Sequence, residues 1–176
     1  MLLFAGSVLC AQERLVVDFE GVTVLLAPND KANRVEQWED KGVVFRPAHA
    51  PKKTKAKGLV MFFEHLSNRH KGIGSAMALE EVPVRATLPK PASEVAVTFW
   101  GSTGVPAVLE AFDADGKVVD RAAVAAAPGR KAPGDPVPMF TLTVKGSKIA
   151  YVQFSGPRPG EYLAAEEVRV TLAAGN

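Results

Sequence analysis

The stretch "EVAVTFW", residues 94–100, gives the strongest indication of the fold. Val95, Val97 and Phe99 fall on one side of an extended chain, and the residues between them fall on the other. This two-residue repeat is typical of a β-strand that buries one face. The same alternation returns in residues 140–144, 149–154 and 167–172. The sequence therefore predicts a protein built mainly from short strands.

Toward the N-terminus, further strands are expected at residues 14–19, 22–26, 42–45 and 59–63, with Gly or Pro in most of the gaps. Only "NDKANRVEQWEDKG" has helical character, because Val35 and Trp38 are three apart and Gly42 suits a C-terminal cap. One short helix is thus expected near residues 31–41. Strands at this spacing, without helices between them, indicate an antiparallel β-sandwich.

The stretch "LEAFDADGKVVD", residues 109–120, raises the question of a calcium loop. Such a loop needs glycine at its sixth place and glutamate at its twelfth, but counting from Asp113 these places do not match. Asp115-Gly116 instead predicts a two-residue hairpin turn in which both residues have positive φ. The Ala/Gly/Pro-rich residues 122–138 are expected to form a long loop between strands.

The first eleven residues, "MLLFAGSVLCA", are uncharged and are followed by a polar change. They are typical of the hydrophobic region of a secretory signal peptide, with cleavage near Ala11, although an apolar first strand is an alternative. Residues 12–176 are expected to form one domain that is secreted, periplasmic or at the cell surface. The single cysteine, Cys10, lies in the expected leader, so the mature chain would have neither a disulfide nor a thiol; lipidation of Cys10 is a minor alternative.

Several short motifs together resemble one bacterial family: "VDFEG", "KGVVF", "VTFWG", "LEAFDADGKVV", "IAYVQFSG" and "EEVRVTL". They are similar to motifs of secreted jelly-roll β-sandwich proteins often found with a PEP-CTERM sorting tail, which are related in shape to galactose-binding-like and carbohydrate-binding modules. The resemblance implies a jelly-roll fold and an exported binding protein. The printed sequence ends in "TLAAGN", which does not support sorting by such a tail.

The resemblance also implies a structural calcium ion, held by acids beside the first and last strands. The matching residues are Glu20, Glu166 and Glu167, whereas Asp18 is expected to lie within the strand. Carboxylate oxygens are the ligands that calcium prefers. The alternative is a solvated strand edge, because pairs of glutamates are common on surfaces.

Catalytic signatures are fragmentary. His65 and His70 have neither a same-face helical spacing nor a common zinc spacing, and His49 is the remaining histidine. Ser102 lacks the nucleophile elbow of a serine hydrolase. The carboxylates of a glycoside hydrolase are available at Glu64, Glu80, Glu81 and Glu110, but nothing pairs them. An enzyme is not indicated.

Aromatic side chains suggest a sugar platform, because the apolar face of a sugar ring stacks on a flat ring. The candidates are Trp38, Trp100, Tyr151 and Tyr162. Trp38 is expected in the core, on the predicted helix. Trp100 and Tyr162 are preferred because each adjoins a loop, with core packing as the alternative.

Residues 46–71 carry seven Lys and Arg against Glu64, in a chain with a net charge of +2. This asymmetry would attract acidic polysaccharide, anionic lipid or nucleic acid, although a solvated loop is the alternative. The candidate ligand-binding cations are Lys52, Lys53, Lys55, Lys57 and Arg69.

The sequence as a whole predicts an exported, non-catalytic module that binds a poly- or oligosaccharide, with acidic glycans as a preferred class. A structural or adhesive surface protein without a small-molecule site is the alternative, and a secreted hydrolase is the third. No cofactor other than calcium and no specific nucleic-acid partner are expected.

Overall fold

The computed structural model describes residues 12–25, 31–53, 57–64, 69–75, 82–101, 104–132, 135–155 and 163–173. These residues form antiparallel β-strands and one 3-10 turn, η1 (Lys31–Asn33). The strands are β1 (Arg14–Asp18), β2 (Arg34–Val35), β3 (Trp38–Asp40), β4 (Val43–Pro47), β5 (Val60–Glu64), β6 (Lys71–Ser75), β7 (Val84–Gly101), β8 (Ala107–Phe112), β9 (Val118–Val124), β10 (Phe140–Ser155) and β11 (Leu163–Leu172). No helix within the described ranges is long and apolar enough to cross a membrane.

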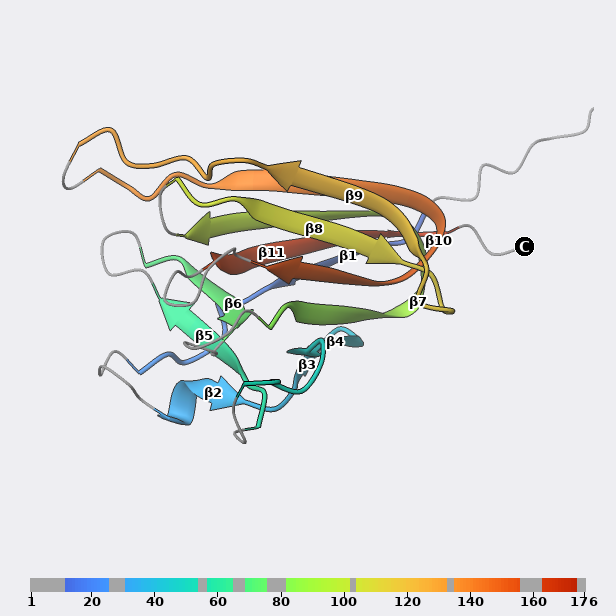
Figure 1. Ribbon diagram of the computed structural model, residues 1–176, viewed down its shortest axis with the longest axis horizontal. Coiled ribbons are helices and arrows are strands. Elements are labelled where there is room, and N and C mark those ends of the chain that lie inside the picture. Colours follow the sequence, from blue (N-terminus) through green and yellow to red (C-terminus); the bar gives the residue numbers. More distant parts are fainter. Residues whose placement is uncertain are drawn as a thin grey trace, which may run out of the picture.

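Two long strands, β7 and β10, pass from one layer of a sandwich into the other (Figure 1). The front layer has the order β3-β4-β7-β10-β8-β9 and uses the first half of β7 and the second half of β10. The back layer pairs the first half of β10 with the second half of β7, and β7 with β11. The other edge of β11 pairs with β6 near its start and with β1 further along, and β6 continues the layer to β5 and β2. Pro89 and Pro91 lie where β7 bends, and prolines are tolerated there because they cannot donate a ladder hydrogen bond.

A single main core fills the space between the layers. Val95, Val97 and Phe99 are fully buried in it, as their alternation predicts, and Phe45 and Phe154 face them from the front layer. The prediction of an all-β antiparallel sandwich of the jelly-roll class is confirmed. The first and last strands are also neighbours, since β1 pairs with β11 along its whole length.

The helix expected near residues 31–41 is wrong. Only η1 has a helical turn, and the chain then forms β2 and β3. Val35 pairs with Val60 of β5, and Trp38 pairs with Phe45 of β4. Tertiary pairing therefore takes both apolar residues into strands, and the spacing that suggested a helix is outweighed. The strand expected at 22–26 is also absent from its described part, residues 22–25.

The hairpin around Gly116 is confirmed, but its turn differs from the prediction. Gly116 has φ of +81°, whereas Asp115 is not among the positive-φ residues of the described chain. The Asp113 carboxylate accepts hydrogen bonds from the backbone N–H groups of Asp115 and Lys117, at 3.0 and 2.9 Å. This Asx-type turn replaces the two-residue turn, because the aspartate side chain satisfies the backbone itself. The loop predicted at residues 122–138 begins later than expected, because β9 extends to Val124; residues 125–132 and 135–139 form no strand.

Candidate functional site

A hollow of about 460 Å³ lies where the edge strands of the two layers, β1 and β3, approach each other. Its lining residues are Asp18, Gly21, Val22, Trp38, Asp40 and Lys41. We call it the edge hollow. Its volume falls within the roughly 300–1,000 Å³ of ordinary small-molecule sites.

Trp38 is the aromatic wall of the edge hollow. It is half-buried, and its ring centroid lies 5.0 Å from that of Phe19 and 5.5 Å from that of Phe45. Phe62 meets the same ring edge-on, also at 5.5 Å. The alternation of β3 places Asp40 on the same side as Trp38. The indole is thus fixed by three phenylalanines and presents its remaining surface beside a carboxylate.

The turn between β3 and β4 closes one end of the edge hollow. Lys41 and Gly42 have φ of 49° and 77°, the positive values that a tight two-residue hairpin turn requires. The Lys41 ammonium donates a hydrogen bond to the Val16 carbonyl oxygen at 2.6 Å and lies 3.9 Å from the Asp40 carboxylate. This lysine therefore ties the edge of the front layer to β1 of the back layer.

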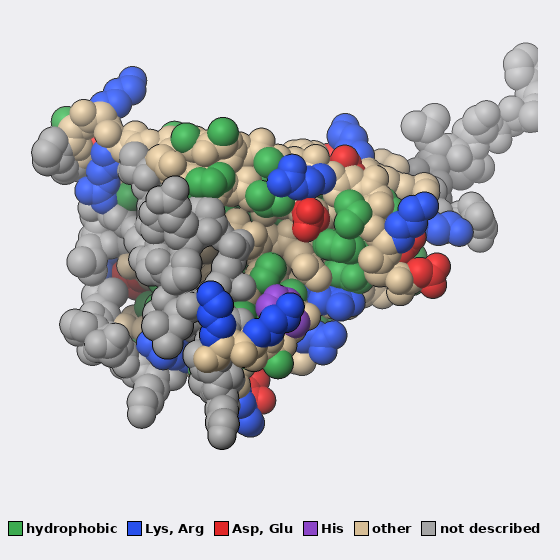
Figure 2. Space-filling view, in the orientation of Figure 1, with side chains coloured by type: hydrophobic (Ala, Val, Ile, Leu, Met, Phe, Trp, Pro, Cys, Tyr) green, Lys and Arg blue, Asp and Glu red, His purple; other side chains and the backbone are tan. Residues whose placement is uncertain are grey.

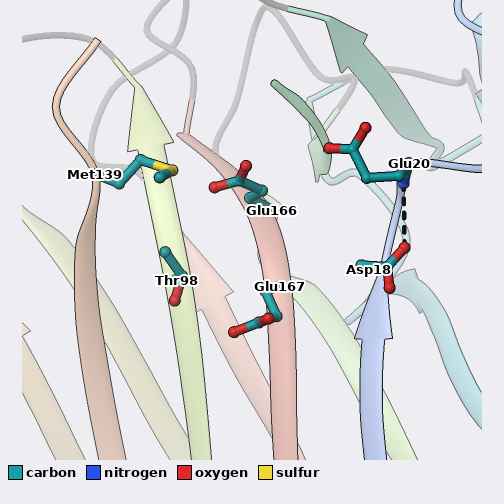
Figure 3. A pocket seen from close by; sticks show the side chains of 6 residues that line it. All are labelled: Asp18, Glu20, Thr98, Met139, Glu166 and Glu167. Carbon is teal, nitrogen blue, oxygen red and sulfur yellow. Dashed lines mark hydrogen bonds between the residues drawn. The ribbon is translucent and has the colours of Figure 1, made fainter. Parts of the chain in front are cut away.

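A second depression, the acidic hollow, adjoins the edge hollow through their shared residue Asp18. It has a volume of about 390 Å³ and is lined by Asp18, Glu20, Thr98, Met139, Glu166 and Glu167 (Figure 3). The pairing of Asp18 with Glu167 across β1 and β11 brings these acids together. An irregularity between Ala165 and Glu167 leaves Glu166 as an extra residue in the strand.

Glu166 is the electrostatically unusual acid of the group. Burial raises the pKa of its carboxyl above the ordinary 4.5, and repulsion from Glu20 and Glu167 adds to that rise. His70, whose Nδ1 lies 2.5 Å from the Glu166 carboxylate, opposes the rise in pKa. Burial is therefore the main reason that the Glu166 carboxyl holds its proton more tightly than an exposed glutamate.

The structure brings the three predicted calcium ligands, Glu20, Glu166 and Glu167, to one hollow. Over the described ranges, however, no three carboxylate or imidazole side chains are arranged to hold a metal ion. Calcium binding stays a prediction.

A glutamine at position 166 tests the electrostatics of the acidic hollow. Because the raised pKa makes the folded protein bind more protons than the unfolded chain above pH 4.5, the wild type loses stability as pH rises through that window. The difference in melting temperature, Glu166→Gln minus wild type, should therefore be larger at pH 7 than at pH 4.5, by up to about 2 °C. Thermal melts at both pH values check this, with Glu13→Gln as an exposed control. A difference that is constant or falls with pH contradicts it.

Trp100 is a buried side chain and not an exposed platform. It is 2% exposed and packs with Val137, Ala164 and Phe63 in a small core of its own. This burial does not fit the expectation that Trp100 offers its ring to a ligand. The other preferred aromatic, Tyr162, lies outside the described residues, as do Ser102 and His65.

The predicted basic residues do not act as one free patch. Lys57 binds Glu36 at 2.6 Å, and this hydrogen bond raises the pKa of Lys57. Arg69 lies 3.0 Å from Glu64. Lys52 and Lys53 are exposed, and Lys55 lies outside the described residues.

Trp38 packs against the main core, as expected, but it is also half-buried and lines the edge hollow, which was not predicted. The signal was present in "WEDKGVVF": Trp38 and Asp40 alternate with an exposed Glu39, and Lys-Gly precedes a strand. That pattern is typical of a hairpin with a tryptophan and an aspartate on one face.

The sequence matches no protein-family model and no curated protein. Among solved structures, the chain is similar to TmCBM61 in complex with β-1,4-galactotriose, at 15% identity and a TM-score of 0.44, over 72% of this chain and 88% of that one. It is also similar to BiXyn10A CBM1, at 8% identity and a TM-score of 0.48, over 90% and 97%. A third similar structure is the K1 cleaved adhesin domain of Lys-gingipain from Porphyromonas gingivalis W83, at 12% identity and a TM-score of 0.42, over 93% and 99%. At these values the likeness adds no argument about a ligand.

Proposed function

We propose that the chain is a non-catalytic carbohydrate-binding module whose sugar lies in the edge hollow. The observation that carries this proposal is the indole of Trp38, which lines a hollow of about 460 Å³ together with Asp18 and Asp40. A sugar ring has an apolar face and a rim of hydroxyls, and the edge hollow offers a partner for each.

Each lining group has a distinct role in this proposal. The Trp38 ring stacks on the apolar face of the sugar. The carboxylates of Asp18 and Asp40 accept hydrogen bonds from sugar hydroxyls, and the Lys41 ammonium donates. The indole and Lys41 are already held in place by the phenylalanines and by the Val16 carbonyl oxygen. Binding therefore costs little ordering of side chains.

A glycan-array screen, followed by calorimetry on the glycans that bind, tests this function. The proposal expects saturable binding of an oligosaccharide with no release of reducing ends. Binding to none of the neutral and acidic glycans would favour a structural or adhesive protein. Release of reducing ends from a bound glycan would favour a hydrolase.

Acidic glycans are the proposed preferred class, supported by the exposed charges of Lys52 and Lys53 beside the front layer. Replacing both with glutamine should weaken an acidic oligosaccharide by up to about fivefold at low salt and leave its neutral counterpart unchanged. Lys148→Gln, a charge removed from β10, is the control. Equal binding of both ligands before and after the double change would remove the preference.

Export is part of the proposal and rests on the uncharged stretch "MLLFAGSVLCA". The protein from its native host is expected outside the cytoplasm, with its mature N-terminus near Gln12. Intact-mass measurement of the isolated protein checks this. A cytoplasmic product that retains Met1 would contradict it.

A further inference from the structure

A row of polar side chains crosses the outer face of the front layer, away from the edge hollow. Strand register places Arg46 of β4 beside Arg85 of β7, then Gln153 of β10, Glu110 of β8 and Arg121 of β9. Figure 2, viewed with β8 and β9 at the front, shows Lys and Arg side chains among hydrophobic ones on this face, with few acidic side chains. The row alternates with buried core positions, so its members share the solvent side of the layer.

The two ends of this row differ in charge balance. Arg121 lies 3.4 Å from the Glu110 carboxylate. Within the described chain, Arg46 and Arg85 show no ion pair, although they are direct neighbours on paired strands. Like charges directly opposite on a sheet destabilise it. One end of the row therefore carries two arginines on adjacent strands, with no ion-pair partner among the described residues.

Arg85 is held in a fixed position. Its guanidinium carbon lies 3.5 Å from the ring centroid of Tyr151, and Tyr151 stacks on Phe112 at 4.8 Å with an interplanar angle of 6°. A cation–π contact of this kind orients the guanidinium and offsets part of the repulsion from Arg46. Its Nε is buried without a hydrogen-bond partner in the described chain. An arginine already positioned in this way loses little entropy when it binds an anion.

The chemistry of the row selects among anionic ligands. Two arginines on adjacent strands match a carboxylate or a sulfate, which accept paired N–H donors. The next residues, Gln153 and Glu110, accept hydrogen bonds from hydroxyls. A sugar acid, which carries hydroxyls beside its carboxylate or sulfate, fits this order.

We propose that Arg46 and Arg85 form a binding site for an acidic sugar, with its carboxylate or sulfate on the arginines and its hydroxyls toward Gln153 and Glu110. This site is separate from the edge hollow and does not require a sugar to bind there. It assigns direct contact with the anionic group to the sheet face, in addition to the salt-dependent attraction proposed for Lys52 and Lys53.

The test titrates the full chain with trigalacturonate, its neutral counterpart galactotriose and inorganic sulfate, each at the same ionic strength, using calorimetry. Arg46→Gln and Arg85→Gln should each weaken trigalacturonate by about tenfold and leave galactotriose unchanged. Lys145→Gln removes one charge from the back layer, where Lys145 pairs with Glu94, and should not weaken trigalacturonate. Sulfate that competes with trigalacturonate would place the anionic group, and not the hydroxyls, on the arginines.

Arg85 also packs on Tyr151, so Arg85→Gln can lower stability as well as affinity. Arg46→Gln, at an exposed residue, and thermal melts of both variants separate the two effects. Unchanged trigalacturonate binding in a folded Arg46→Gln protein overturns the proposal, as does no trigalacturonate binding to the wild type. An equal loss in Lys145→Gln also overturns it, in favour of nonspecific charge attraction. If Trp38→Phe loses galactotriose binding but keeps trigalacturonate binding, the result bears on the edge hollow only and supports a separate arginine site.

Discussion

Trp38→Ala is expected to weaken the binding of a neutral oligosaccharide by at least about 30-fold, which corresponds to a loss of about 2 kcal/mol at a central aromatic contact. The reason is that Trp38 is the aromatic side chain lining the edge hollow, and its ring supplies the apolar surface on which the sugar lies. Calorimetry with the best ligand from the glycan array measures the change.

Trp38 also packs on three phenylalanines, so the alanine variant will lose stability as well. Trp38→Phe keeps an aromatic ring in this cluster and should show an intermediate loss of affinity in a protein that melts close to wild type. Trp100→Phe is the matched control: it changes the buried tryptophan and should leave affinity unaltered. Wild-type affinity in a folded Trp38→Ala protein would contradict the account.

Gly74→Ala is expected to lower the melting temperature by about 5–10 °C, because overpacking of this kind costs about 1–3 kcal/mol or more. A Cβ at Gly74 would lie 2.4 Å from the Leu163 carbonyl oxygen and 3.0 Å from the Phe63 ring. The carbonyl belongs to β11, the strand that links β6 to β7 in the back layer, and backbone cannot yield as a flexible side chain can.

The control for this substitution is Gly21→Ala. A Cβ there meets nothing within 4 Å, and Gly21 is not among the positive-φ glycines. Its melting temperature should stay within about 1 °C of wild type, since exposed substitutions without such contacts have small effects. Equal melting temperatures for both variants would show that the close approach of β6 to β11 does not limit stability.

The strand content could be predicted because alternation at Val95, Val97 and Phe99 reflects a physical requirement of a half-buried strand. The neighbourhood of Glu20, Glu166 and Glu167 also follows from the pairing of the first and last strands, which the predicted fold class implied. These features depend on short-range pattern and on topology, and both can be read from one sequence.

The tryptophans show what could not be predicted. Trp100 and Trp38 both lie at strand ends, so their local sequence does not distinguish them. Val137 and Ala164 pack on Trp100, whereas Trp38 lines the edge hollow. The continuation of β7 through Pro89 and Pro91 could not be predicted either, because prolines normally indicate the end of a strand. The arginine pair of the front layer depends on the register between β4 and β7, which no local pattern contains.

The most direct test of the account is a titration with the binding oligosaccharide followed by the indole N–H signals in a ¹⁵N–¹H NMR spectrum. The chain has two tryptophans, so it gives two such signals, and Trp38→Phe assigns them. The account predicts that the Trp38 signal shifts in a saturable way while the Trp100 signal stays in place. A saturable shift of the Trp100 signal with an unmoved Trp38 signal would contradict the edge hollow as the sugar site.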